Sequence, residues 1–204
     1  MGTIHTVEKQ TENRFLNMYN VKATSVHNTP VNYYVASRAE SIDKLKIKIG
    51  KNIPDGVIIY SLYGEKHDKV VLIRQYRYAI GDYIYEFPAG LVEPGEDFHE
   101  GAAREMYEET GLKLEPLKVD ESFEKPFFTT VGMTDESCAA VYGYASGEIS
   151  KAAQEDSEEI EVVLADRDEV RRILKEENVA IMCAYMLMHF LHDEEPFGFL
   201  QLED

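Results

Sequence analysis

Apolar residues occur along this chain in short runs separated by polar turns, and these runs predict its strands. The runs are rich in valine, isoleucine, tyrosine and phenylalanine, which fit a pleated, half-buried surface. In the central and C-terminal parts of the chain we expect strands at Val57–Tyr63, Lys69–Tyr76, Tyr83–Phe87, Lys118–Phe128, Cys138–Ser146 and Ile160–Ala165.

A separate group of strands precedes this series. Residues 1–13 are polar and are expected to be frayed. The strands that we expect after them are Arg14–Ala23, Val31–Ala39 and Lys44–Ile49. The Asn52–Gly56 turn then marks a boundary. We therefore predict an N-terminal β subdomain, residues 1–52, and a main domain, residues 53–204. So few strands are only marginally stable in water by themselves. We therefore expect the subdomain to pack against a larger part of the protein.

Helices are expected in three places. The first begins at Asp97 or Phe98 and ends at Thr110, with Gly111 at the position after the helix where glycine is favoured. The second begins near Asp166 or Asp168 and reaches about Glu177. The third is Val179–His192, whose core-facing stripe is predicted to be Met182, Ala184, Tyr185, Met188 and Leu191.

Charge and cysteine content narrow the function classes. The chain has 38 acidic and 21 basic side chains and a net charge of −17, which argues against binding nucleic acid or an anionic membrane. Cys138 and Cys183 lie far apart and form no CxxC pair, which favours a reducing cytoplasm. The longest apolar run, Ala180–Leu191, is shorter than the ~20 residues that a membrane span needs.

Three glutamates of the first helix are the clearest candidate for chemistry. Glu105, Glu108 and Glu109 stand at i, i+3 and i+4, which places them on one helix face. Like charges held this close repel each other, and a bound cation is the usual reason for tolerating that repulsion. Hard carboxylate oxygens suit Mg²⁺, with Mn²⁺ as a second possibility. The alternative is an ordinary solvated face on a helix of an acidic protein.

The stretch around these glutamates carries a longer pattern. It reads GLVEPGEDFHEGAAREMYEETGL from Gly90 to Leu112, with Glu96, Arg104 and Gly111 in register with the glutamates. The pattern resembles the Nudix box. This resemblance implies an α+β fold, an α/β/α sandwich with a mixed sheet between helices, and the hydrolysis of a nucleoside diphosphate linked to a further group.

The resemblance also implies roles for box residues. Glu105, Glu108 and Glu109 match the family's metal-binding glutamates, and Glu105 and Glu109 are counted with the catalytic groups. The carbonyl of Ala89 matches a position that completes the metal shell. The residues that match structural positions of the box are Gly90, Glu96, Arg104 and Gly111.

Residues outside the box indicate a branch of the family. Tyr85–Leu91, the preceding Arg74–Arg77 and Pro126 are similar to the ADP-ribose and nucleotide-sugar pyrophosphatases. Thr130-Val131 departs from the commoner Ser-Pro of that branch. The substrate contacts that the resemblance implies are Arg77, Glu86 and Leu91, joined by Tyr33 and Arg38 reaching from a partner subunit. A homodimer with shared active sites is therefore expected.

A glutamate on a late loop is expected to act on the attacking water or to bind an additional metal. Glu158 matches that position, and Glu155 and Glu159 are competitors on the same acidic stretch. The activity that we expect is Mg²⁺-dependent cleavage of ADP-ribose, a small-molecule substrate, to AMP and ribose 5-phosphate. The alternatives are an ADP- or GDP-hexose as substrate, or a Nudix domain that senses a ligand without catalysis.

Overall fold

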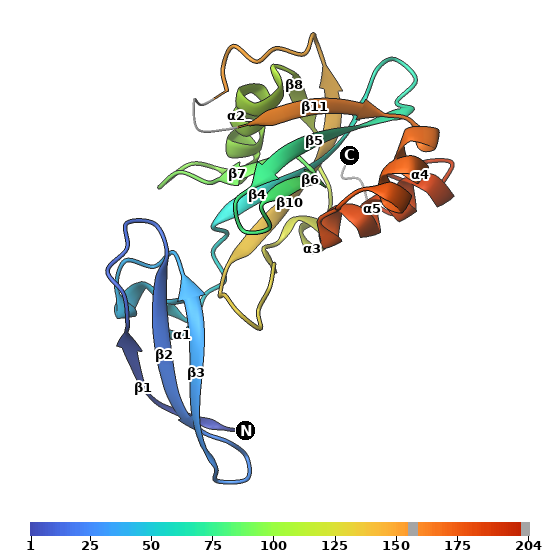
Figure 1. Ribbon diagram of the computed structural model, residues 1–204. Helices are drawn as coiled ribbons and strands as arrows, with labels where there is room; N and C mark the ends of the chain where they lie inside the picture. The colour runs from blue at the N-terminus through green and yellow to red at the C-terminus, as the bar shows by residue number, and fades with distance from the viewer. Residues whose placement is uncertain (155–158, 201–204) are drawn as a thin grey trace. The chain divides into compact units, whose positions relative to one another are not determined.

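The computed structural model describes residues 1–154 and 159–200. The chain divides into two compact units (Figure 1). The first unit comprises Met1–Asp55 and Pro126–Cys138, and the second comprises Gly56–Lys125 and Ala139–Asp204. The N-terminal part of the chain therefore shares its unit with a segment that comes much later in the sequence.

The first unit is built on a small antiparallel sheet of three strands in the order β1-β2-β3. Its strands are β1 (Thr3–Lys9), β2 (Asn17–Thr24) and β3 (Pro30–Ser37). Val7, Tyr19, Val21 and Leu45 form its buried core. The predicted N-terminal β structure is thus confirmed, and it gains a first strand from residues expected to be merely polar.

The predicted strand Lys44–Ile49 is wrong. This stretch forms a 3₁₀ turn, η1 (Ile42–Lys44), and a short helix, α1 (Lys46–Ile49), which ends at Gly50 with a φ of 67°. The alternation of Leu45, Ile47 and Ile49 suggested a half-buried strand. Only Leu45 enters the core, however, and the two isoleucines are exposed.

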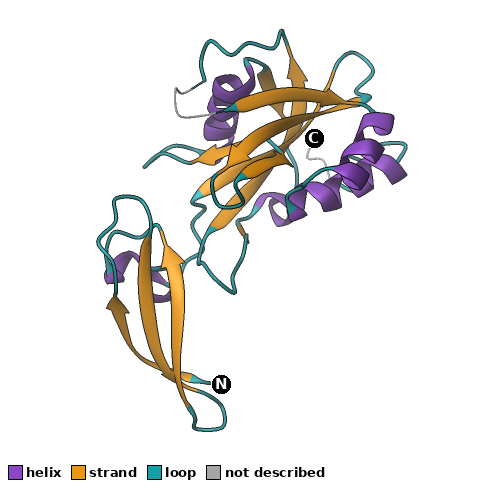
Figure 2. Cartoon of the chain, in the orientation of Figure 1, coloured by secondary structure: helices purple, strands orange, loops and turns teal. Residues whose placement is uncertain are grey.

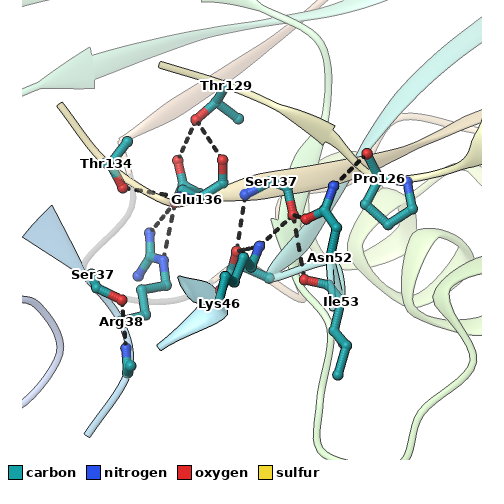
Figure 3. A network of polar contacts seen from close by, with 12 residues as sticks. Ser37, Arg38, Lys46, Asn52, Ile53, Pro126, Thr129, Thr134, Glu136 and Ser137 are labelled. Atoms are coloured by element: carbon teal, nitrogen blue, oxygen red, sulfur yellow. Dashed lines mark hydrogen bonds and ion pairs between the residues drawn. The ribbon is translucent and has the colours of Figure 1, made fainter. Parts of the chain in front are cut away.

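Polar contacts join residues 126–138 to α1 and to the turn that follows it (Figure 3). The Lys46 ammonium contacts the Asp55 carboxylate at 2.6 Å and also bonds the Ser137 hydroxyl. The Asn52 amide donates to the Pro126 carbonyl at 2.8 Å. Within the segment, β9 (Phe127–Phe128) pairs with Ser137 and Cys138.

The second unit contains most of a larger sheet, which has eight strands in the described part of the chain. Five strands follow one another in the order β11-β5-β4-β10-β8, while β6, β7 and β9 pair with β5, β4 and β10. Their bounds are β4 (Gly56–Tyr63), β5 (Lys69–Arg77), β6 (Asp82–Glu86), β7 (Ala89–Leu91), β8 (Lys113–Pro116), β10 (Ser137–Ser146) and β11 (Ile160–Ala165).

Helices cover both faces of this sheet, which confirms the predicted sheet between helix layers (Figure 2). On one face, α2 (Phe98–Thr110) buries Ala102 and Met106 against Val57, Ile59 and Val71. On the other face, α4 (Arg167–Glu176) and α5 (Ile181–His192) pack against Leu62, Val70 and Leu72. Among the described residues, no helix is long and apolar enough to cross a membrane.

Strand alternation assigns polar residues to these two faces. Successive side chains of a strand point to opposite faces, so Gln75 and Arg77 share the α2 face with Val71. Arg74 and Tyr76 share the α4–α5 face with Leu72 by the same reasoning. The register Ile73↔Glu86 between β5 and β6 adds Glu86 to the α2 face.

Two further expectations are corrected. The predicted strand Lys118–Phe128 contains instead a short helix, α3 (Glu121–Glu124), because the Asp120 side chain accepts from the Ser122 backbone N–H and caps a helical turn. The core stripe predicted for α5 is only partly correct, because Leu191 packs against the core and the fully buried residues were not in the stripe. Cys183, Leu187 and Phe190 are the buried residues, whereas Tyr185 and Met188 are more than half exposed.

Candidate active site

The helix α2 is capped at both ends, and Gly111 has the capping role that the sequence predicts for it. At its start, the Asp97 carboxylate accepts from the His99 backbone N–H at 2.9 Å. At its end, Gly111 has a φ of 76°, in the left-handed region that glycine adopts without strain, and its N–H caps the Tyr107 carbonyl. Burial of Ala102 and Met106 then fixes which face carries the glutamates.

Arg104 binds the acidic groups of this site together. Its Nε donates to Glu96 Oε1 at 2.9 Å, and its Nη1 donates to Glu105 Oε1 at 2.8 Å and to Glu108 Oε2 at 2.9 Å. Its Nη2 also donates to the Leu91 carbonyl at 2.9 Å. The surrounding carboxylates, Glu96 first, raise the pKa of Arg104, so the guanidinium stays charged. The loop after β7 and the helix are thereby joined through one side chain.

Glu109 lies deeper than the other two glutamates of the set. It is 3% exposed, and its Oε2 accepts from the Ala89 backbone N–H at 3.0 Å. Gly90, the next residue along β7, lies against the Glu105 carboxylate so closely that an added methyl group would overlap it. The strand β7 and the glutamate face of α2 are therefore in direct contact.

An open pocket of about 460 Å³ lies between β7 and α2. Its lining residues include Ala89, Gly90, Leu91, Arg104, Glu105 and Glu108. Carboxylate oxygens beside a backbone carbonyl are donors that hard divalent cations prefer. The pocket places such donors together, which fits the metal that the sequence predicts.

The carboxylates are engaged with partners from the chain itself. Among residues 1–154 and 159–200, no three His, Cys, Asp or Glu side chains converge in an arrangement that could hold a metal ion. Arg104 donates hydrogen bonds to Glu105 and Glu108 and compensates part of their negative charge. The Glu109 carboxylate accepts a hydrogen bond from a backbone amide. Arg104 contacts one oxygen of each of the Glu105 and Glu108 carboxylates, and a carboxylate can bind a cation through its other oxygen.

The Glu96–Arg104 pair gives the fold a predictable acid response. The hydrogen bond from Arg104, and then the Glu93 backbone N–H, lower the pKa of Glu96 from 4.5 to about 2. A carboxyl with a depressed folded pKa stabilises the fold above its unfolded pKa, and this contribution is lost as pH falls through the folded pKa. We therefore expect the free energy of unfolding to drop between about pH 4.5 and about pH 2, less steeply in Glu96→Gln. Urea titrations across that range measure both slopes, and equal slopes would contradict the assignment.

Two of the predicted substrate contacts of the second unit, Arg77 and Glu86, lie on the face of the sheet that α2 covers. Arg77 and Glu86 form an ion pair, with Nε and Oε2 at 2.7 Å, and nearly half of the Arg77 side chain is exposed. Leu91 is 49% exposed and lines the pocket beside α2. An incoming phosphate would compete with Glu86 for the Arg77 guanidinium. Substrate binding by these residues remains a prediction.

Tyr33 and Arg38 belong to the first unit, where both contact the 126–138 segment. The Tyr33 hydroxyl donates to the Gly132 carbonyl at 2.7 Å. The Arg38 guanidinium pairs with Glu136 at 3.0 Å, and Thr129 also donates to that carboxylate (Figure 3). The 126–138 segment is thus bonded to the two residues expected to reach a partner's site.

Of the three acidic candidates that could act on the attacking water, only Glu159 lies among the described residues. Glu155 and Glu158 lie outside the described residues. The Glu159 carboxylate accepts from the Tyr83 hydroxyl, whose ring lies 3.9 Å from the Arg74 guanidinium. Tyr83 and Arg74 are on the α4–α5 face of the sheet, opposite α2. The Glu159 side chain therefore lies on the face of the sheet opposite the glutamates of α2.

Contacts from the β10–β11 connection to α2 were not predicted. Ser150 N–H donates to the Thr110 carbonyl at 2.9 Å, and the Gln154 amide donates to the Glu109 carbonyl at 2.6 Å. No motif in the sequence marks these residues, because they bond main-chain atoms of residues some 40 positions earlier, as the 45-residue separation of Gln154 and Glu109 illustrates.

Comparison with known proteins identifies the family. The NUDIX domain model matches residues 53–184, well over half of the chain. The chain is 29% identical over 146 residues to the methanol dehydrogenase activator of Bacillus methanolicus, covering 70% of this chain and 74% of that protein. It is 49% identical over 49 residues to the ADP-sugar pyrophosphatase of Mus musculus, covering 24% of this chain and 22% of that protein.

A solved structure shares the fold. The crystal structure of an ADP compounds hydrolase aligns with a TM-score of 0.60 and 19% identity, covering 86% of this chain and 83% of that one. The chain belongs to the Nudix hydrolase family. Enzymes of this family use a divalent metal. Carboxylates such as those beside Ala89 are suitable ligands for that ion.

Proposed function

We propose that this protein is a Mg²⁺-dependent pyrophosphatase that cleaves ADP-ribose to AMP and ribose 5-phosphate. The observation that carries the proposal is the contact between β7 and α2. Ala89, Glu105 and Glu108 line one open pocket there, and the buried Glu109 carboxylate bonds the Ala89 backbone N–H beside it. The residues similar to the ADP-ribose branch, Tyr85–Leu91, lead directly into that pocket. The mouse ADP-sugar pyrophosphatase among the relatives supports the substrate class.

The proposed reaction uses the residues of the chain in distinct roles. Glu105, Glu108, Glu109 and the Ala89 carbonyl would hold Mg²⁺, with Mn²⁺ as a substitute. The ion supplies positive charge that neutralises a diphosphate and polarises its phosphorus. Arg104 and Glu96 position the carboxylates, and Arg77 offers a guanidinium to the diphosphate or the terminal ribose. Glu158 is proposed to act on the attacking water.

Two alternatives make different use of the same site. An ADP- or GDP-hexose pyrophosphatase would share the metal and diphosphate contacts and differ in how the sugar or base is bound. A ligand sensor would bind without turnover, yet such domains usually lose a box glutamate. This chain retains Glu105, Glu108 and Glu109 with Arg104 placed to order two of them, which supports catalysis.

A panel of nucleoside diphosphate sugars tests the substrate assignment. With Mg²⁺ present, kcat/KM is compared for ADP-ribose, ADP-glucose, GDP-mannose and ADP. We expect ADP-ribose to have the highest value and ADP to be cleaved poorly. A higher value for either hexose would move the assignment to that nucleotide sugar and leave the metal site as proposed.

We further propose that two copies of the chain associate through the first unit. An open pocket of about 630 Å³, lined mainly by apolar side chains, lies within that unit between its sheet, α1 and the 126–138 segment. Its lining residues include Ile4, Val31, Tyr33, Ile47, Phe128 and Val131. Such a surface is suited to burial against a second chain, and Tyr33 and Arg38 would then contribute to the partner's site.

Placing a charge in this pocket should separate the copies. We expect Ile47→Asp, at a side chain that is 46% exposed in the isolated chain, to sediment as a monomer and to lose activity. The matched control is Val26→Asp, which adds the same charge at an exposed position outside the pocket. Arg38→Ala should raise KM while the protein stays dimeric. A wild-type protein that is active as a monomer would contradict the proposal of shared active sites.

A further inference from the structure

The last turn of α2 is bonded to a distant part of the chain. The final carbonyls of a helix have no hydrogen-bond partners within the helix. In α2, residues beyond the helix donate hydrogen bonds to three carbonyls of the last turn. Gly111 N–H caps the Tyr107 carbonyl at 2.8 Å, and Ser150 N–H caps the Thr110 carbonyl at 2.9 Å. The Glu109 carbonyl receives the Gln154 side-chain amide at 2.6 Å. Two of these three partners come from the β10–β11 connection.

The backbone path of that connection is set by close contact with the helix end. A methyl group on Gly111 would lie 2.6 Å from both Ser150 Cβ and Ser150 N, so the connection passes directly over the glycine. A turn follows, in which Gln154 N–H donates to the Lys151 carbonyl at 3.3 Å. This turn directs the half-buried Gln154 side chain back towards α2, where it meets the Glu109 carbonyl.

Glu109 is consequently held at both of its polar ends. Its carboxylate accepts from Ala89 N–H on β7 at 3.0 Å, and its carbonyl accepts from Gln154. A metal ligand gains affinity when the groups behind it fix its position before the ion arrives. The Ala89 backbone amide restrains the carboxylate of Glu109, and the Gln154 side-chain amide restrains its backbone.

We propose that Gln154 is a positioning residue for Glu109, and that its amide sets the site's affinity for the divalent ion. This inference rests on the proposed role of Glu109 as a metal ligand. Gln154 itself bonds main chain and contacts neither the ion nor the substrate. Its contribution is to keep the end of α2, and with it the deepest glutamate of the site, in place relative to Ala89.

Three substitutions separate positioning from simple helix capping. Gln154→Met keeps the length and shape of the side chain and removes the donor. Gln154→Lys restores a donor that can reach the carbonyls at a helix end. Lys151→Met is the matched control on the same turn, at an exposed side chain away from α2. Loss of one capping bond is a small part of the stability of a folded domain, so all three proteins are expected to fold.

The test is a titration of each full-length protein with Mn²⁺, with free Mn²⁺ followed by electron paramagnetic resonance. The Glu109→Gln protein, titrated in parallel, defines which binding belongs to this site rather than to the acidic surface. We expect Gln154→Met to raise the Kd for Mn²⁺ about tenfold or more. Gln154→Lys and Lys151→Met should stay close to wild type.

The possible outcomes are distinct. An unchanged Kd in Gln154→Met, whatever its thermal midpoint, would overturn the proposal and leave Gln154 as a cap alone. A Kd raised equally in Gln154→Met and Gln154→Lys would also overturn it, since the donor would not be what matters. If wild type and Glu109→Gln titrate identically, Glu109 is not a ligand, and the metal assignment falls before Gln154 is considered.

Discussion

The Glu109→Gln protein is expected to fold normally and to lose Mg²⁺-dependent turnover by about a thousandfold or more. An amide oxygen can still accept the Ala89 N–H bond that now holds the side chain at 3.0 Å, so local packing should survive. The negative charge that attracts the ion is removed. A metal contributes several kcal/mol to such a reaction, and each 1.4 kcal/mol is a factor of ten in rate.

The control for this substitution is Glu100→Gln, which makes the same chemical change at an exposed position of the same helix. Steady-state kcat/KM at saturating Mg²⁺, with the thermal midpoint measured beside it, compares the two proteins. Glu100→Gln should match wild type in both. Substantial residual activity in a well-folded Glu109→Gln protein would remove Glu109 from the metal site.

The second large effect is expected from Gly90→Ala. A methyl group at this position would overlap the Glu105 carboxylate, which is the far end of a flexible side chain and can move aside. The backbone should therefore keep its path while Glu105 leaves its place beside Arg104. Disturbing the support of a metal site costs about 10–100-fold in affinity or activity, and we expect a loss of that size in kcat/KM.

A double-mutant cycle shows whether the effect of Gly90→Ala passes through Glu105. In the Glu105→Gln background, the added methyl group should cause little further loss, because the side chain that it displaces no longer supplies a charge. If Gly90→Ala lowers kcat/KM by the same factor with and without Glu105→Gln, the added methyl group acts through β7 itself. Thermal midpoints of the four proteins distinguish either result from unfolding.

The helix α2 could be predicted closely from the sequence because its signals are local. An N-cap Asp97, apolar positions at helical spacing and a C-terminal Gly111 all lie within the segment that they define. The placement of Glu108 beside Arg104 follows from the same helical geometry, since residues four apart share a face. The contact between Arg104 and the adjacent Glu105 does not follow from that spacing.

Elements decided by distant contacts were harder to predict. The strand β1 is polar and is specified by pairing with β2 rather than by its own composition. The pattern of α5 offered several apolar faces, and only packing against the sheet selects Cys183, Leu187 and Phe190 as the buried one. Likewise, nothing near Gln154 in the sequence indicates that its amide meets Glu109.

The grouping of residues 126–138 with the N-terminal strands is another consequence of long-range contacts. Lys46 and Asn52 bond residues that come more than 70 positions later, such as Pro126 and Ser137. Tyr33 and Arg38 likewise bond the carbonyl of Gly132 and the carboxylate of Glu136. Family resemblance pointed to both segments separately, and only the structure shows that they are bonded to each other.

The most direct test of the proposed activity is the product released from ADP-ribose by the purified protein with Mg²⁺. We expect AMP and ribose 5-phosphate in equal amounts, with no turnover after chelation of the metal. Tight binding of ADP-ribose without release of AMP would contradict it and would identify the protein as a ligand sensor.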